Sequence, residues 1–279
     1  YGGTYALVTH QFERLGIRYS FVPKTVEAIG EAITTDTKLI FVETPTNPLL
    51  GIIDIERVSA LARERSITTM IDNTFASPIN QNPLTLGIDI VVHSGTKYIG
   101  GHSDICCGAV LTSKELAEPM KMTAMDLGGS LNAATCALVE RSLKTLHLRV
   151  SRQSENALTV AQRLTEQEKI DQVFYPGLTS HPGHEVAARQ MSAFGGMISF
   201  TLADSAGSAL EFLRRLELVV PALSLGGIES TICAPAETSH KKMSKEARER
   251  IGVTERLMRL SVGIEHPEDL LDDLLQALG

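Results

Sequence analysis

The sequence predicts an α/β domain with a mostly parallel sheet, followed by a smaller α+β domain. Over the first half of the chain, short runs that are apolar at nearly every position alternate with segments whose apolar residues recur at helical spacing. Strands that are apolar on both faces and separated by helices are typical of a parallel sheet covered on both sides. Later strand-like runs instead alternate apolar and polar residues. The expected domains are therefore residues 1–148 and 149–279.

Four strands are expected in the first domain, each a short apolar run. They cover residues 38–42, 68–72, 88–92 and 108–112. The polar cluster 43–48 contains two prolines, which cannot continue a helix, so it is expected to form a loop just beyond the first strand. Asp54 precedes an apolar stripe at helical spacing, and a helix is therefore expected to begin there.

The second domain is expected to begin and end with helices. Apolar residues recur at helical spacing from Asn132 to about Gln167 without Gly or Pro, which predicts one or two long helices leading out of the first domain. Residues 197–202 and 257–264 alternate like half-exposed strands. The chain then ends in an amphipathic helix.

The composition excludes several classes of protein. Of 279 residues 43% are hydrophobic, and 26 Lys+Arg face 33 Asp+Glu, which gives a net charge of −7. This composition is too apolar for disorder, and its charge disfavours binding to nucleic acid or to an anionic membrane. No run approaches the roughly 18 uncharged apolar residues of a membrane span. The basic run 240–245 lacks interleaved aromatic residues and is expected to be a solvated approach to a helix.

The cysteines and histidines predict neither a disulfide framework nor a metal site. Cys106, Cys107, Cys136 and Cys233 show no CxxC spacing, so a reducing cytoplasm is the expected compartment. Adjacent Cys106 and Cys107 are expected to be buried. The pair His181 and His184 lies in a loop with Pro and Gly and without a third ligand nearby, so no metal is expected.

The segment 91–104 is the most informative part of the chain. It reads Val-Val-His-Ser-Gly-Thr-Lys-Tyr-Ile-Gly-Gly-His-Ser-Asp. Lys97 follows an apolar strand and lies among hydroxyls and glycines, and a lysine whose pKa is lowered forms Schiff bases with carbonyl groups. Ser94 and Thr96 alternate with glycine, a composition suited to holding a phosphate. Lys97 by itself would leave open the alternative of a surface lysine in a turn.

Asp72 ends the second strand and is followed by Asn-Thr-Phe. An Asp at a strand end is usually a helix cap or a turn residue. In parallel α/β sheets, however, ligands bind outside the carboxyl ends of the strands, where Asp72, Asn47 and Lys97 would emerge together. Pyridoxal phosphate requires a carboxylate for its ring nitrogen and a Schiff-base lysine. The sequence therefore predicts a pyridoxal-phosphate site at this edge.

The segments 72–75 and 94–104, together with their spacing, closely resemble the motifs of the Cys/Met-metabolism family of pyridoxal-phosphate enzymes. That family includes cystathionine γ-synthase, cystathionine β- and γ-lyases, methionine γ-lyase and O-acylhomoserine sulfhydrylases. Further blocks match in order along the whole chain, namely residues 1–5, 43–48, 224–227 and 259–263. The resemblance implies an aspartate-aminotransferase-like enzyme of fold type I.

The resemblance implies a role in cofactor binding for five of these residues. Lys97 would form the internal aldimine and, once freed by substrate, would shuttle protons. Asp72 would pair with the pyridinium nitrogen, and Asn47 would contact the phenolic oxygen. Ser94 and Thr96 would bind the phosphate.

Three more residues would act on the ring or on the substrate. Tyr1 would stack on the pyridine ring and assist proton transfer at the leaving group. Arg259, assisted by the region of Ser224, would hold the substrate α-carboxylate, a task that suits a guanidinium because it binds carboxylates bidentately. Arg259 alternates out of phase with its apolar neighbours, so it points away from their face. By itself it could equally be a surface charge on an edge strand.

The resemblance implies a pyridoxal-phosphate-dependent carbon–sulfur lyase of transsulfuration, within cysteine and methionine metabolism. It would cleave cystathionine or a related sulfur amino acid by β- or γ-elimination. The alternative is γ-replacement, as in cystathionine γ-synthase or O-acylhomoserine sulfhydrylase. Leu223 stands where γ-synthases have a glutamate and favours a less polar substrate tail, whereas Gly3 stands where methionine γ-lyases usually have a cysteine. The substrate signal is therefore mixed.

The resemblance also implies an oligomer. The chain opens at Tyr1 without an initiator Met, and members of the family begin earlier, so a preceding segment is expected. In the family that segment completes the active site of a neighbouring subunit. An obligate homodimer, doubled into a tetramer, is therefore expected.

Overall fold

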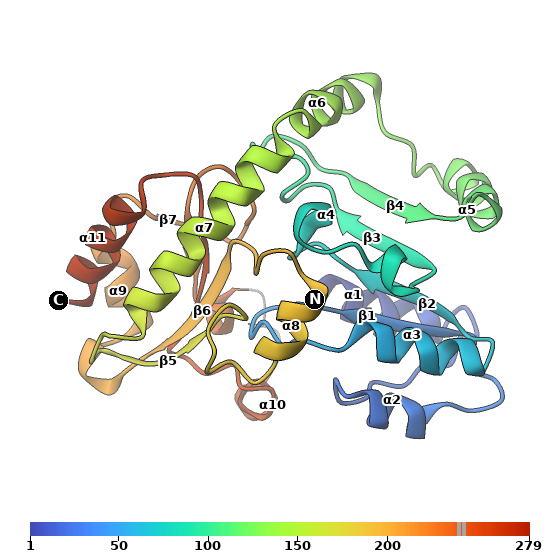
Figure 1. Cartoon of the computed structure of the whole chain (residues 1–279), viewed down its shortest axis with the longest axis horizontal. Coiled ribbons are helices and arrows are strands. Elements are labelled where there is room, and N and C mark those ends of the chain that lie inside the picture. Colours follow the sequence, from blue (N-terminus) through green and yellow to red (C-terminus); the bar gives the residue numbers. More distant parts are fainter. Residues whose placement is uncertain (239–240, 242–243) are drawn as a thin grey trace.

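Two β-sheets, one in each half of the chain, organise the structure, a computed structural model that describes residues 1–238, 241 and 244–279 (Figure 1). The first sheet has the strand order β1-β2-β3-β4 and the second the order β5-β6-β9-β8-β7. The long helix α7 (Leu146–Leu164) runs diagonally between them. This arrangement confirms the predicted α/β domain followed by an α+β domain. The boundary predicted between residues 148 and 149 falls inside the first turn of α7 and stays a prediction.

The first sheet is parallel except for one edge strand. Its strands are β1 (Leu39–Glu43), β2 (Thr68–Asp72), β3 (Ile90–Ser94) and β4 (Gly108–Thr112). Strands β1, β2 and β3 pair in parallel, and β4 pairs with β3 in the antiparallel sense. All four lie within two residues of their predicted positions, although β1 and β4 each expose apolar residues, among them Leu39 and Phe41 on β1. The parallel register brings Glu43 opposite Asp72 at the carboxyl edge.

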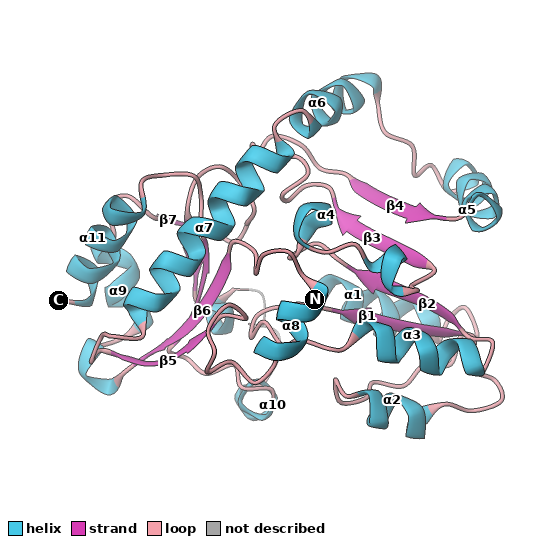
Figure 2. Ribbon diagram, in the orientation of Figure 1, coloured by secondary structure: helices cyan, strands magenta, loops and turns pink. Residues whose placement is uncertain are grey.

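Helices surround this sheet, as Figure 2 shows. They are α1 (Gly2–Leu7) with a π-helical turn (Val8–Phe12), α2 (Val26–Ala32), α3 (Ile55–Glu64), α4 (Ser77–Asn80), a 3₁₀ turn (Pro83–Leu86), α5 (Lys114–Asp126) and α6 (Ala133–Leu143). Helix α3 begins as predicted, because the Asp54 side chain accepts a hydrogen bond from the Arg57 backbone N–H at 3.1 Å. Ile55 and Val58 of α3 pack on Ile71 of β2 in the core of this domain.

The second sheet is mostly antiparallel, and two of its strands are more buried than the sequence predicted. Its elements are β5 (Ile170–Phe174), α8 (His184–Gln190), β6 (Met197–Leu202), a 3₁₀ turn (Asp204–Ala206), α9 (Ala209–Arg215), β7 (Val220–Pro221), β8 (Thr231–Cys233), a 3₁₀ turn (Pro235–Glu237), α10 (Lys245–Arg250), β9 (Leu257–Ser261) and α11 (Pro267–Leu278). The expectation that β6 and β9 are half-exposed was wrong. Their apolar residues pack among α7, α9 and α11. Their polar residues face the first domain instead of solvent.

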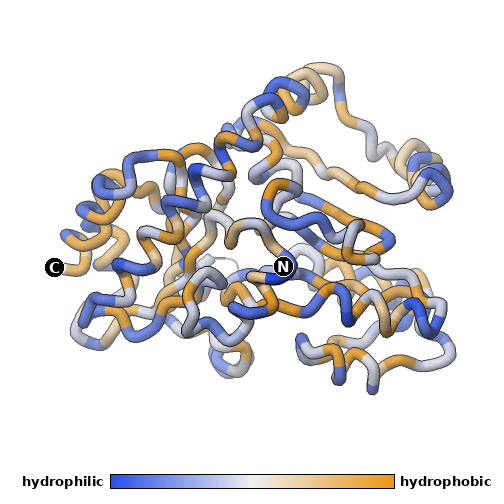
Figure 3. Tube along the Cα trace, in the orientation of Figure 1, coloured by the Kyte–Doolittle hydropathy of each residue, from blue (hydrophilic) through white to orange (hydrophobic). Residues whose placement is uncertain are grey.

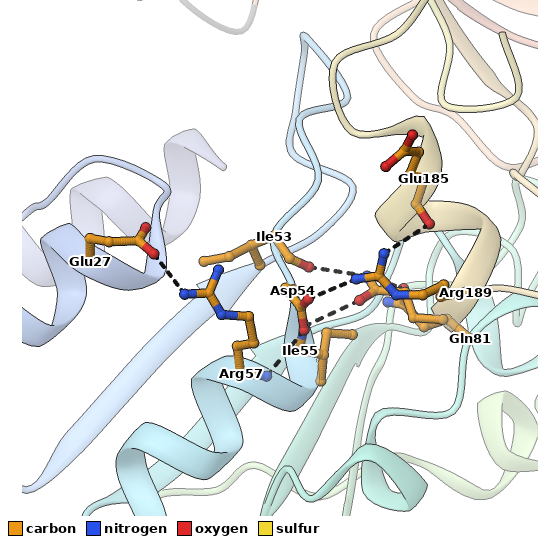
Figure 4. Close-up of polar contacts among 9 residues, drawn as sticks. Glu27, Ile53, Asp54, Ile55, Arg57, Gln81, Glu185 and Arg189 are labelled. Carbon is orange, nitrogen blue, oxygen red and sulfur yellow. Dashed lines mark hydrogen bonds and ion pairs between the residues drawn. The ribbon is translucent and has the colours of Figure 1, made fainter. Parts of the chain in front are cut away.

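Contacts between the domains explain this burial. The Ser199 hydroxyl of β6 donates to the Pro48 carbonyl oxygen at 2.7 Å. Farther along the interface, Arg189 of α8 pairs with Asp54 at 2.9 Å, as Figure 4 shows. The Ile55 N–H donates to the side-chain oxygen of Gln190 at 3.2 Å. The polar face of β6 and β9 therefore meets the loops that follow β1.

Strand β4 exposes apolar residues. Figure 3 shows it as a hydrophobic segment, and Val110 and Leu111 are 56% and 41% exposed. Just before it, Cys106 is exposed and Cys107 half-buried, so the expectation that both are buried was wrong. The reason is that, within the described residues, α5 follows β4 but buries none of its own residues and so leaves this edge of the sheet exposed.

The described part of the chain contains no helix long and apolar enough to cross a membrane. The helical run predicted from 132 to 167 is confirmed as two helices, α6 and α7, separated at Lys144 and Thr145. Residues 240, 242 and 243 of the basic run 240–245 lie outside the described residues, and Lys245 begins α10.

Candidate active site

The carboxyl ends of β1, β2 and β3 meet at one edge of the first sheet, where Asn47, Asp72 and the Lys97 turn follow them. The Thr74 N–H donates to the Asp72 carboxylate at 2.9 Å, and the Thr74 hydroxyl accepts from the Ser94 N–H at 2.8 Å. Thr74 thus ties the ends of β2 and β3 together. The expectation that these segments emerge side by side rests on parallel topology, which the structure has.

A compact turn presents Lys97 directly after β3. The Lys97 N–H donates to the Ser94 carbonyl at 3.1 Å, and the Gly101 N–H donates to the Lys97 carbonyl at 2.7 Å. The Lys97 Nζ donates to the Ser224 hydroxyl at 3.3 Å, which joins the first domain to the loop before β8. Burial, and then the positive charge of Arg259, lower the pKa of Lys97. A lowered pKa makes the lysine a stronger candidate for nucleophile and base.

The stretch Ser94-Gly95-Thr96 forms a loop with little room for side chains. A Cβ at Gly95 would lie 2.5 Å from the Cys107 Sγ, so only glycine fits there. The Cys107 N–H donates to the Thr96 hydroxyl at 3.1 Å, and this bond fixes the loop against the start of β4. The Ser94 and Thr96 N–H groups donate to Thr74 and to the Cys107 carbonyl, so the two hydroxyls are the groups that this loop can offer to a phosphate.

Arg259 lies at the centre of the second sheet, since β9 pairs with β6 on one side and β8 on the other. The alternative of a surface charge on an edge strand is therefore wrong, and the side chain is only 3% exposed. One guanidinium nitrogen donates to the Asn47 side-chain oxygen at 3.1 Å and the other to the Leu223 carbonyl at 2.8 Å. Among the described residues it pairs with no carboxylate, and its buried Nε has no hydrogen-bond partner. A buried guanidinium with spare donors is suited to bind an anion.

Asn47 is held from both domains. Its N–H donates to the Glu43 carboxylate at 2.8 Å, while its side chain accepts from Arg259. Tyr1 lies at the same end of β1, where its backbone nitrogen donates to Glu43 at 2.7 Å. Tyr1 is 63% exposed, and its hydroxyl makes no hydrogen bond within the described residues. The structure thus gathers Asn47 with Arg259, and Lys97 with Ser224, but leaves the Tyr1 ring apart from both pairs.

His93 is a buried neighbour of the site that the sequence analysis did not single out. It is 4% exposed on β3, next to Val92, the residue opposite Asp72 in the register. Burial lowers the pKa of His93 to about 4, although the Asp72 charge acts in the opposite direction. The alternation of β3, in which His93 falls on the face of Val91, was the available signal.

The chain is similar to known proteins over its entire length. A family model described as "Cys/Met metabolism PLP-dependent enzyme" matches residues 1–279. The chain is 46% identical to the cystathionine beta-lyase of Lactococcus lactis subsp. cremoris, covering 100% of this chain and 73% of that protein. It is 47% identical to the cystathionine gamma-synthase of Mycobacterium tuberculosis, covering 100% of this chain and 72% of that protein. The crystal structure of cystathionine gamma-lyase from Lactobacillus plantarum complexed with L-serine has a TM-score of 0.96 and 38% identity, covering 99% of this chain and 73% of that one.

Proposed function

Because the chain belongs to the Cys/Met metabolism PLP-dependent enzymes, we propose that it is a carbon–sulfur lyase acting on cystathionine or a related sulfur amino acid. One observation carries this proposal. A half-buried lysine amine of lowered pKa and a buried guanidinium that pairs with no carboxylate of the described residues share one site. Ser224 contacts the lysine, and Leu223 contacts the arginine. An amino-acid substrate needs both groups, because the amine acts at its Cα and the guanidinium binds its carboxylate.

The residues at the sheet edge fit pyridoxal phosphate. Asp72 would offer a carboxylate to the ring nitrogen. Asn47, whose N–H donates to Glu43 opposite Asp72, would be a polar contact for the ring oxygen. The hydroxyls of Ser94 and Thr96, on either side of Gly95, would bind the phosphate. When bound, the cofactor supplies an aldehyde for Lys97 and a ring that withdraws electrons from the substrate Cα.

The protein's own groups then orient the substrate and move its protons. Arg259 would bind the α-carboxylate bidentately, which fixes the direction of the Cα–H bond relative to Lys97. The Lys97 amine, held by the Ser224 hydroxyl at 3.3 Å, would remove the Cα proton and return it later. Tyr1, at the β1 end of the same edge, is proposed to assist proton transfer to the leaving group.

A γ-replacement reaction on an O-acylhomoserine is the second candidate. The similarity to a cystathionine gamma-synthase, at 47% identity, favours it as much as the similarity to a beta-lyase favours cleavage. Both reactions need the same lysine, carboxylate-binding arginine and cofactor. They differ in whether water or a thiol completes the reaction.

A substrate panel separates the two candidates. Cystathionine, methionine, cysteine and O-acylhomoserines with a thiol are incubated with the enzyme, and keto acid, ammonia and thioether are measured. A lyase releases keto acid and ammonia from cystathionine without added thiol, whereas thioether formed only from an O-acylhomoserine indicates the transferase. Lys97→Ala should abolish turnover and the visible absorbance of the bound cofactor, while Lys38→Ala, at an exposed position, is the control. A Lys97→Ala protein with full turnover would contradict the assignment.

We further propose a cytoplasmic location and a homo-oligomer, most simply a dimer of dimers. All four cysteines are free thiols, which suits a reducing compartment. Helix α5 buries none of its residues and exposes Met125 and Leu127 by 58% and 81%, and apolar exposure of this kind marks interaction surfaces. Sedimentation of the cofactor-loaded protein tests this, since a fully active monomer would exclude a shared site.

A further inference from the structure

Helix α7 buries three polar side chains along one face. Arg149, Gln153 and Asn156 are four and three residues apart, a spacing that places them on the same side of a helix. They are 5%, 0% and 1% exposed. Buried polar groups need partners, and each of these three donates to backbone carbonyl oxygens.

Arg149 binds the turn that presents Lys97. One guanidinium nitrogen donates to the Tyr98 carbonyl at 2.8 Å, and the other donates to the carbonyls of Ile99 at 3.4 Å and Ser142 at 3.0 Å. Among the described residues no carboxylate pairs with it. The charged guanidinium therefore donates hydrogen bonds to the carbonyl groups that directly follow Lys97. Charged donors make stronger hydrogen bonds than neutral ones.

Gly101 makes room for this guanidinium. It has a φ of +70°, and a Cβ built at this position would overlap the Arg149 side chain. The Gly101 N–H also closes the turn by donating to the Lys97 carbonyl, and its own carbonyl accepts from the Ile228 N–H at 3.0 Å. The turn is thereby connected to the loop that follows Ser224.

The other two side chains bind the loops on the substrate side. Gln153 donates to the Gly227 carbonyl at 2.6 Å, in the loop that begins with Ser224. Asn156 donates to the Gly263 carbonyl at 3.1 Å, just beyond β9 and Arg259. One rigid helix face therefore contacts the three segments that carry Lys97, Ser224 and Arg259.

We propose that this face of α7 sets the position of the Lys97 amine relative to the carboxylate-binding side, with Arg149 positioning Lys97 and Gln153 positioning the Ser224 loop. The inference rests on the proposed function. Arg149 acts through the backbone of the turn, so its loss should disturb proton transfer at Cα more than substrate binding. A displacement of about 1 Å at a reacting group can cost roughly 10²-fold in rate.

The test compares Arg149→Met, Arg149→Lys and Gln153→Met with the control Arg152→Met on the half-exposed side of α7. We expect Arg149→Met to lower kcat per bound cofactor by roughly 10²-fold with KM changed less than about 3-fold. Arg149→Lys, which keeps a charged donor, should recover part of that loss. Gln153→Met should mainly raise KM, because it frees the loop on the substrate side. Arg152→Met should match the wild type.

Hydrogen exchange supplies a readout that does not depend on turnover. In Arg149→Met the Gly101 amide should exchange faster than in the wild type, and Arg149→Lys should be intermediate. If Arg149→Met does not fold, Arg149→Lys tests the proposal instead. We then expect a smaller loss of kcat and a Gly101 amide that exchanges faster than in the wild type. Unchanged exchange at Gly101 together with wild-type kcat per bound cofactor would overturn the proposal. Absence of turnover in the wild type would instead overturn the proposed function, and the exchange result would still decide the role of Arg149.

Discussion

Acidification should destabilise the protein through His93. The imidazole is 4% exposed, and burial lowers its pKa from 6.5 to about 4. Because the folded pKa lies below the unfolded one, the unfolded state binds more protons as the pH falls below 6.5. The contribution of neutral His93 is therefore fully present above pH 6.5 and is lost as the pH falls toward 4.

The size of this effect follows from the pKa difference. Each pH unit between the two pKa values removes about 1.4 kcal/mol of stability. From the unfolded pKa of 6.5 to pH 5, this amounts to about 2 kcal/mol, and little is lost between pH 7.5 and 6.5. That loss is a large fraction of a typical unfolding free energy, so it should be easy to measure.

The assay is urea unfolding at pH 7.5 and 5.0 for the wild type and His93→Gln, with the exposed His147→Gln as the matched control. Gln cannot titrate, so the variant should lose about 2 kcal/mol less than the wild type over this interval. His147→Gln should lose as much as the wild type. An equal loss in the wild type and His93→Gln would refute the argument that burial keeps His93 neutral.

Three further variants test the site and its frame. Arg259→Lys should raise KM roughly 10- to 100-fold with a smaller change in kcat, since it loses the bidentate geometry, and steady-state kinetics would measure this. Gly226→Ala should weaken cofactor binding, because Gly226 has a φ of +75° and a Cβ there would lie 2.8 Å from the backbone nitrogen of Tyr98, next to Lys97. An unchanged affinity for the cofactor in a spectroscopic titration would contradict this expectation. Asp273→Asn should lower the unfolding free energy by about 2 kcal/mol at pH 7. Burial raises the pKa of Asp273, but bonds from the N–H groups of residues 217–219 hold it below its usual value, so the difference should vanish as the pH falls below 3.8.

Local patterns predicted the fold well where burial alone decides the pattern. The runs around Ile40, Ile71 and Val91 contain one face that packs against α3 in the core of the first domain, and that burial keeps the face apolar. Parallel topology brings Asp72 and the turn with Lys97 to one edge of the sheet, as the two short segments predicted. Such reasoning needs only the direction of each strand.

The remaining features depend on how the domains meet. The alternation around Ser199 and Arg259 has the same form whether the polar face meets solvent or another domain, so the pattern alone predicted half-exposed strands. Likewise Arg149 and Gln153 fall in a helix rich in charged residues, where such side chains are ordinarily solvated. Their burial follows from the loops packed against α7, and those loops are distant in sequence.

Attachment through a carbonyl oxygen leaves an exposed loop residue free to vary in its side chain. Every residue has a carbonyl, so a bond to that group does not depend on which side chain the residue carries. The same holds for Leu223, whose carbonyl accepts from Arg259 while its side chain is 58% exposed. A library randomised at residue 223 should therefore keep the Arg259 bond to its carbonyl, and with it the proposed binding of the substrate carboxylate. The scaffold separates the part of the enzyme that must stay constant from the part that can diversify.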